Sequence, residues 1–136
     1  MPSPDFDTVA LVTVEENQDA FTVGLAEDET GEGAYLILQC ALTPPNANET
    51  ATGLDTYCLL DENGAVQYGG VTHATLNDTT LTLTLTDEAA EELDVENNTG
   101  TITLTVPQQD TARLAEGLHR IFTYGNPDKQ PQLAGI

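Results

Sequence analysis

The segment Thr79–Thr86 reads TTLTLTLT, and this pattern decides the fold class of the chain. Leu81, Leu83 and Leu85 alternate there with threonine residues. Successive side chains of a β-strand point to opposite faces, so the pattern predicts a strand with one buried leucine face and one hydrated threonine face. Thr101–Val106 repeats the alternation. Alternation of this kind is typical of antiparallel sheets that are solvated on one side.

Turn-forming residues separate further apolar segments along the chain, and Asn63-Gly64 is a strong signal for a hairpin. A longer polar loop is expected at Thr43–Gly53. We therefore predict a meander of about seven to eight strands. The additional expected strands are Thr8–Val14, Ala20–Ala26, Ala34–Cys40, Thr56–Leu60, Val66–Tyr68 and Thr72–Leu76.

Two segments have helical patterns. Asp87–Leu93 predicts a short acidic helix with Asp87 as its N-cap. Asp110–Phe122 predicts a longer helix that begins at Asp110 or Thr111 and packs its apolar stripe on the leucine face of the sheet. The expected fold class is α+β, mainly antiparallel sheet with one short helix and a C-terminal helix packed on the sheet. Residues 1–125 are expected to form a single domain, and residues 126–136 a flexible tail.

Charge limits the classes of partner that the chain can bind. It carries 23 Asp and Glu residues against 3 Lys and Arg residues, a formal net charge of −20 at pH 7. Such a surface repels phosphate, so nucleic acids and anionic membranes are not expected partners. The acidity fits either recognition of a basic protein or adaptation to a salt-rich, halophilic cytoplasm. The scattered acids and the single lysine, Lys129, favour adaptation.

The N-terminus shows no basic segment followed by an apolar one, and no apolar run approaches the ~20 residues of a membrane span. A cytoplasmic protein is therefore expected. In that compartment Cys40 and Cys58 are expected to be reduced thiols, although a bridge between neighbouring strands stays open. They form no CxxC motif, which argues against zinc, and only His73 lies near enough in sequence to serve Cys58 as a base. We expect no enzyme and no cofactor.

Acidic residues crowd around Gly31 and Gly33, where their oxygens could hold a divalent cation. The spacing differs from that of a calcium loop, so a solvated hairpin tip is the favoured interpretation. These residues are Glu27, Asp28, Glu29 and Glu32.

Three blocks of sequence carry a resemblance to a known family. They are GLAED at residues 24–28 leading to YLILQ at 35–39, GLDTYC at 53–58, and YGGV at 68–71. In this order and spacing, over Val9–Phe122, the chain resembles the immunity protein 10 family of bacterial polymorphic toxin systems. The resemblance implies a small non-enzymatic protein that binds and neutralises a cognate toxin, which is usually encoded by a neighbouring gene. The extreme acidity is a departure that fits a halophile's version.

If the toxin domain is basic, acidic side chains near these blocks would meet it. The candidate partner-binding residues are Glu27, Asp28, Glu29, Glu32, Asp55, Tyr57 and Tyr68. A calcium-binding module or a structural oligomerisation module is the alternative, and both a monomer and a homodimer stay open. Oligomerisation would need an apolar outer sheet face, and the threonine-lined faces argue against one.

Overall fold

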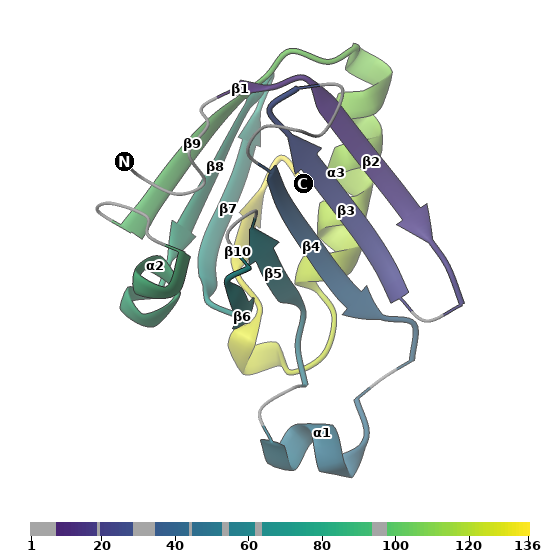
Figure 1. Ribbon diagram of the computed structural model, residues 1–136, viewed down its shortest axis with the longest axis vertical. Helices are drawn as coiled ribbons and strands as arrows, with labels where there is room; N and C mark the ends of the chain where they lie inside the picture. Colours follow the sequence, from purple (N-terminus) through teal and green to yellow (C-terminus); the bar gives the residue numbers. More distant parts are fainter. Residues whose placement is uncertain are drawn as a thin grey trace.

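The computed structural model describes residues 8–18, 20–28, 35–43, 45–52, 55–61, 64–93 and 98–136. These residues form two five-stranded sheets and helices, the α+β class that the sequence predicts (Figure 1). The expected hairpin tip at Glu29, Glu32 and their neighbours, the Asn63 turn position and the Gly53-Leu54 pair lie outside the described residues.

The first sheet, called the N-terminal sheet here, is a meander in which each strand pairs antiparallel with the next. A positive φ at Gly64 belongs to the connection that brings the last two strands together as the expected hairpin. The strands are β2 (Leu11–Glu16), β3 (Ala20–Ala26), β4 (Tyr35–Ala41), β5 (Cys58–Asp61) and β6 (Val66–Tyr68).

The second sheet, called the threonine sheet, has the strand order β1-β9-β8-β7-β10. Its three central strands pair antiparallel, whereas β1 and β10 each add to an edge in parallel. The strands are β1 (Thr8–Val9), β7 (Val71–Asn77), β8 (Thr80–Leu85), β9 (Thr99–Leu104) and β10 (Gln132–Ala134).

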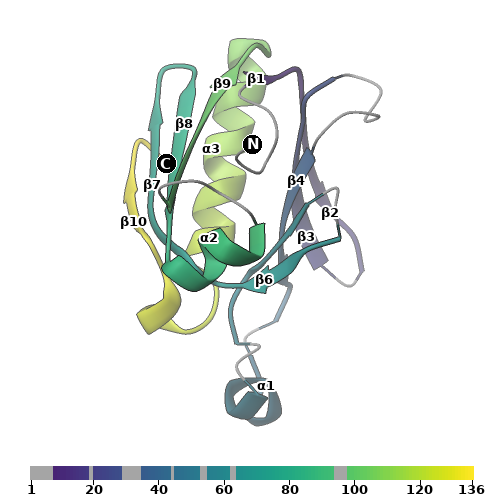
Figure 2. The same cartoon turned by 60° about the vertical axis from the view of Figure 1, so that its left-hand side comes forward.

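The helices are α1 (Ala47–Thr52), α2 (Asp87–Leu93) and α3 (Gln108–Phe122), with a short 3₁₀ turn, η2 (Pro127–Lys129). Figure 2 shows α3 between the two sheets, against the N-terminal one. The helix contacts β2, β3 and β4. It approaches closely at Gly117, where an added Cβ would lie 2.8 Å from Val23 Cγ2.

The aliphatic side chains of both sheets share one core with α2 and α3. Leu81, Leu83 and Leu85 of β8 are buried, as the alternation of leucine and threonine in Thr79–Thr86 predicts. Tyr57 and Phe122 are completely buried and meet edge to face with ring centroids 5.2 Å apart. Such pairs add stabilisation beyond the area that they bury.

Several details differ from the sequence expectations. The strands divide into two sheets because the chain passes from β6 to β7 through Gly69 and Gly70, whose positive φ values turn it away from the N-terminal sheet. Helix α1 forms inside the expected polar loop, where Asn46 and Glu49 exchange backbone and side-chain hydrogen bonds in a capping box. Thr86, and not Asp87, caps α2, since its Oγ1 accepts a hydrogen bond from Ala89 N at 3.2 Å.

The start of α3 and the C-terminal segment also differ from expectation. Helix α3 begins at Gln108, directly after its N-cap residue Pro107, and therefore before the expected caps Asp110 and Thr111. Residues 126–136, expected as a flexible tail, contain η2 and β10. Strand β10 pairs with β7 in register from Gln132 with His73 to Ala134 with Thr75. Its three residues carry too short a pattern for a strand to be recognised from sequence.

Candidate interaction surface

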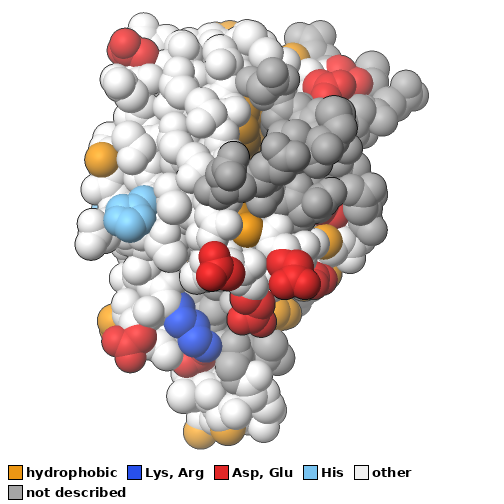
Figure 3. Space-filling view, turned by 90° about the vertical axis from the view of Figure 1, so that its left-hand side faces the viewer, with side chains coloured by type: hydrophobic (Ala, Val, Ile, Leu, Met, Phe, Trp, Pro, Cys, Tyr) orange, Lys and Arg blue, Asp and Glu red, His pale blue; other side chains and the backbone are white. Residues whose placement is uncertain are grey.

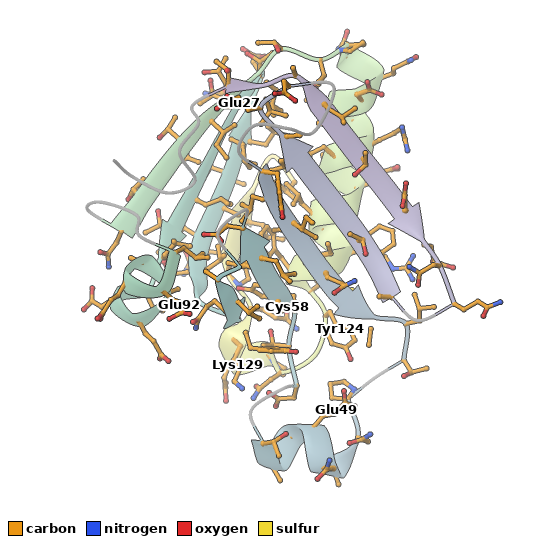
Figure 4. The ribbon with its side chains drawn as sticks, viewed as in Figure 1. Glu27, Glu49, Cys58, Glu92, Tyr124 and Lys129 are labelled. Atoms are coloured by element: carbon orange, nitrogen blue, oxygen red, sulfur yellow. The ribbon has the colours of Figure 1, made fainter. Side chains whose placement is uncertain are left out.

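The acidic residues at the end of β3 are exposed only in part. Glu27 is exposed and Asp28 is half-buried directly after the strand. Their expected companions Glu29 and Glu32 lie outside the described residues. Figure 4 labels Glu27 and Lys129 at opposite ends of the N-terminal sheet. Because Asp55 is bonded to Lys129, it does not join Glu27 in one acidic patch.

Asp55 is buried, with 4 % of its surface exposed, and it anchors the C-terminal segment. Lys129 Nζ donates a hydrogen bond to Asp55 Oδ1 at 2.6 Å, and Asn126 Nδ2 donates one to Oδ2 at 3.1 Å. The Lys129 ammonium, followed by the Asn126 amide, holds the pKa of Asp55 below its ordinary value, although burial opposes this. Asp55 therefore has a structural role that joins the start of β5 to the segment leading into β10.

Tyr57 is fully buried and links the two sheets. Its hydroxyl accepts a hydrogen bond from Val71 N at 3.0 Å, at the first residue of β7. Burial raises the pKa of Tyr57 to about 12, so the phenol stays protonated. Because the side chain of Tyr57 has no exposed surface, it does not contact a partner. Tyr68, by contrast, lies on the edge strand β6 with 43 % of its surface exposed.

All three basic side chains of the chain make intramolecular contacts with acids. Arg120 forms an ion pair with Glu16 at 2.7 Å, and its guanidinium lies 4.3 Å from the centre of the Phe21 ring. Arg113 lies 3.7 Å from Asp110, and Lys129 is bonded to Asp55. With only three cations for 23 acids, most of the negative charge has no basic partner within the chain.

The thiols and histidines form no catalytic pair. Cys40 and Cys58 are both free; they lie on adjacent strands but point to opposite faces of the N-terminal sheet. Burial raises the pKa of Cys40 to about 11 and also raises that of Cys58, which disfavours a nucleophilic thiolate. His73 is exposed on β7 in the other sheet, so it does not serve Cys58 as a base. No group of three or more metal-ligating side chains gathers within the described residues.

The outer face of the threonine sheet is polar, and none of the described residues of its strands is acidic. Strands β7, β8 and β9 contain no Asp or Glu, and their outward residues stand in cross-strand pairs such as Thr82 with Thr101. In Figure 3, which looks at the molecule from the side of β9 and α2, much of the surface is white, the colour of the backbone and of uncharged polar side chains such as threonine. Red acidic side chains gather in the lower half of that view. We call the following set the threonine face: Thr75, Thr80, Thr82, Thr84, Thr99, Thr101 and Thr103.

The outer face of the N-terminal sheet is different, because apolar side chains cross all five of its strands. Ile37, Leu60 and Val66 form one row across consecutive strands, since Ile37 is opposite Leu60 and Leu60 is opposite Val66. Leu11, Ala26 and Tyr35 form the adjacent row. These six residues are called the apolar face. Val66 is 44 % exposed, whereas the other large side chains are partly exposed.

The apolar face was not predicted from the sequence, because threonine was expected on the outer side of the sheet. The signal lies in YLIL at residues 35–38, where apolar residues occupy both strand faces. A strand that is apolar on both sides either is buried on both sides or presents an apolar surface. Here Leu36 and Leu38 enter the core, which leaves Tyr35 and Ile37 on the outer side.

An apolar surface on one sheet of an acidic α+β domain is the kind of surface with which proteins bind other proteins. The chain belongs to the immunity protein 10 family, whose model matches residues 8–112. Membership of this family supports a role as an immunity protein and implies a toxin protein as the partner. No curated protein and no solved structure matches the chain. No helix in the described residues is long and apolar enough to span a membrane.

Proposed function

We propose that this protein is a non-enzymatic immunity protein that binds the toxin domain of a bacterial polymorphic toxin in the cytoplasm and neutralises it. The family match over residues 8–112 is the observation that carries the proposal. The separation of Cys58 from His73, on different sheets, supports a binding role over thiol chemistry. Neutralisation then follows from occupation of the toxin's surface, with no reaction at the immunity protein.

The proposed toxin domain is basic at its contact surface. A net charge of −20 accelerates the encounter with a cationic partner and disfavours acidic ones. Among the residues expected from sequence, Glu27, Asp28 and Tyr68 remain candidates for contact because their side chains reach the surface, and Glu29 and Glu32, outside the described residues, stay predicted contacts. Asp55 and Tyr57 support the fold beneath that surface and are not proposed as contacts.

The acid surplus also fits adaptation to high salt, because carboxylates hold water and cations in a concentrated solution. The scarcity of lysine and the uncharged threonine face support adaptation to high salt as a second reason for the composition. Adaptation predicts that the folded protein tolerates concentrated potassium chloride. Recognition by charge predicts that salt slows association, since screening weakens steering.

Co-expression with the C-terminal domain encoded by the adjacent gene tests the proposal. The expected result is that this protein restores growth of cells that make the toxin domain, and that the two proteins co-purify. An unrelated acidic protein of similar size is the control for charge alone, and it should give neither result. Continued growth arrest together with no co-purification would contradict the proposed function.

A further inference from the structure

Resting on the proposed function, we infer that the toxin domain docks on the apolar face of the N-terminal sheet through an apolar patch of its own that is rimmed by basic side chains. The row Ile37, Leu60 and Val66 continues on β3 at Gly24, which is opposite Ile37, and on β2 at Thr13. With strands spaced about 4.8 Å apart, the row extends over roughly 19 Å. This is a continuous surface and not a set of scattered exposed residues.

A shallow hollow in this face provides a place for an anchoring side chain of the partner. Its volume is about 200 Å³, and its walls are almost entirely apolar. It forms because Gly24 has no side chain between Thr13 and Ile37; an added Cβ there would lie 2.5 Å from Thr13 Oγ1. Leu11 and Tyr35 complete the walls. Anchors in pockets of this kind supply much of the binding energy in protein interfaces.

The rim of the apolar face is negative. Glu15 is exposed on β2 in the row beyond Thr13, and Glu27 is exposed directly after Ala26. The three basic side chains make contacts within the chain: Arg120 pairs with Glu16 and covers Phe21, and Lys129 is bonded to Asp55. Arg113 of α3 lies near Asp110 and donates a hydrogen bond to Val14 O of β2. Charge complementarity therefore selects a partner whose own rim is basic.

The same charges argue against a second copy of this chain as the occupant. Two copies that meet through this face would oppose their Glu15 and Glu27 rims, and each copy carries a net charge of −20. Like charges across an interface disfavour association. The threonine face is a weaker candidate, since its outward side chains are small and hydroxylated and leave little apolar surface to bury.

The test exchanges the character of the two faces. The first variant carries Ile37→Thr, Leu60→Thr and Val66→Thr; the matched control carries Thr75→Val, Thr82→Val and Thr101→Val. Both change three β-branched or aliphatic positions on outer sheet faces and leave the net charge unaltered. The probe is the catalytically inactivated C-terminal domain encoded by the adjacent gene, with Kd measured by calorimetry and folding checked by melting temperature. We expect at least about thirtyfold weaker binding for the first variant and a change of less than about threefold for the control.

The outcomes separate the docking face from the function itself. If the unaltered protein does not bind the probe, the proposed function fails. If it binds and the folded first variant binds equally well, or the control variant loses binding, the docking face is wrong while the function stands. If the unaltered protein is a dimer that the first variant dissociates, the face belongs to self-association and the inference is overturned.

A single substitution covers the case in which the triple variant fails to fold. Val66→Lys places a cation at an exposed position in the apolar row, where it would meet the basic rim of the toxin and lose apolar contact. We expect at least about tenfold weaker binding to the same probe. Thr82→Lys is its control on the other sheet, with the same change in net charge, and should weaken binding by less than about threefold. Unchanged binding of Val66→Lys would overturn the inference.

Discussion

The two sheets are alike on their inner faces and opposite in character on their outer faces. Both contribute aliphatic side chains to one core, such as Leu38 from the N-terminal sheet and Leu81 from the threonine sheet. Outside, one presents threonine hydroxyls and the other presents Ile37, Leu60 and Val66. Adaptation to salt acts on the whole surface, so it does not account for a difference between two faces of one chain. The apolar face is where a functional explanation is needed.

The sheets are also joined at one end by buried polar contacts. Tyr57, which precedes β5, bonds the backbone of Val71 at the start of β7. Asp55 bonds Lys129 and Asn126 in the segment that leads to β10. If this junction holds the sheets together, changes at the junction should cost more stability than changes at the two outer faces.

Removal of residues 126–136 should have the largest effect on stability. It deletes β10, exposes the edge of β7, and leaves the buried carboxylate of Asp55 without Lys129 and Asn126. A buried charge without its partner is strongly unfavourable. We expect the melting temperature to fall further than for any substitution below. A truncated protein that melts like the complete chain would show that the domain ends at residue 125.

Replacement of Tyr57 with Phe should destabilise the fold by about 1–3 kcal/mol, because the buried Val71 N–H then has no acceptor. The edge-to-face contact with Phe122 is kept, so packing changes little. Urea unfolding measures the loss. Tyr68→Phe is the control, since Tyr68 is exposed, and it should lie within about 0.5 kcal/mol of the unaltered protein. Equal stability of the two variants would show that the Tyr57 hydroxyl does not stabilise the junction between the sheets.

Asp55 should make the free energy of unfolding depend on pH in the acidic range. Its folded-state pKa lies below the ordinary value of 3.8, so its contribution is fully present above pH 3.8 and is lost as the pH falls toward the folded pKa. Protonation of the other acids relieves repulsion at the same time, so the comparison is between the unaltered protein and Asp55→Asn. We expect the difference in their unfolding free energies to shrink as the pH falls below about 4. A constant difference would contradict the ion pair.

The smallest effects on stability are expected at the outer faces themselves. Ile37→Thr should cost no more than about 1 kcal/mol, because the side chain is only partly buried. Thr82→Val on the threonine face should change stability by less than about 0.5 kcal/mol. Thermal unfolding measures both. A loss of several kcal/mol for Ile37→Thr would show that this face is a covered part of the core.

Alternation at Thr79–Thr86 and the apolar stripe of Leu114, Leu118 and Ile121 were enough to predict β8, α3 and the α+β class. Such local periodicity does not predict which strands become neighbours in a sheet. The parallel additions of β1 and β10 depend on contacts between residues far apart in sequence, such as Val9 with Leu104, and were not predicted.

In the candidate site, too, features that depend on nearby residues could be predicted, and features that depend on residues far apart in sequence could not. The exposed acid Glu27 could be recognised from its place in an acidic turn. The burial of Asp55 and Tyr57 depends on Lys129 and Phe122 from the end of the chain, so sequence reasoning took these two residues for surface groups. The apolar face depends on the register of five strands. The sequence YLIL at residues 35–38 indicates an apolar outer side at one of these strands only.

Growth rescue tests the central claim most directly. Cells that make the adjacent toxin domain would receive the unaltered protein, the variant with Ile37→Thr, Leu60→Thr and Val66→Thr, or the control with Thr75→Val, Thr82→Val and Thr101→Val, all at matched soluble levels. We expect the unaltered protein and the control to restore growth and the first variant to fail to restore it. Rescue by the first variant, or failure of the control alone, would contradict the central claim.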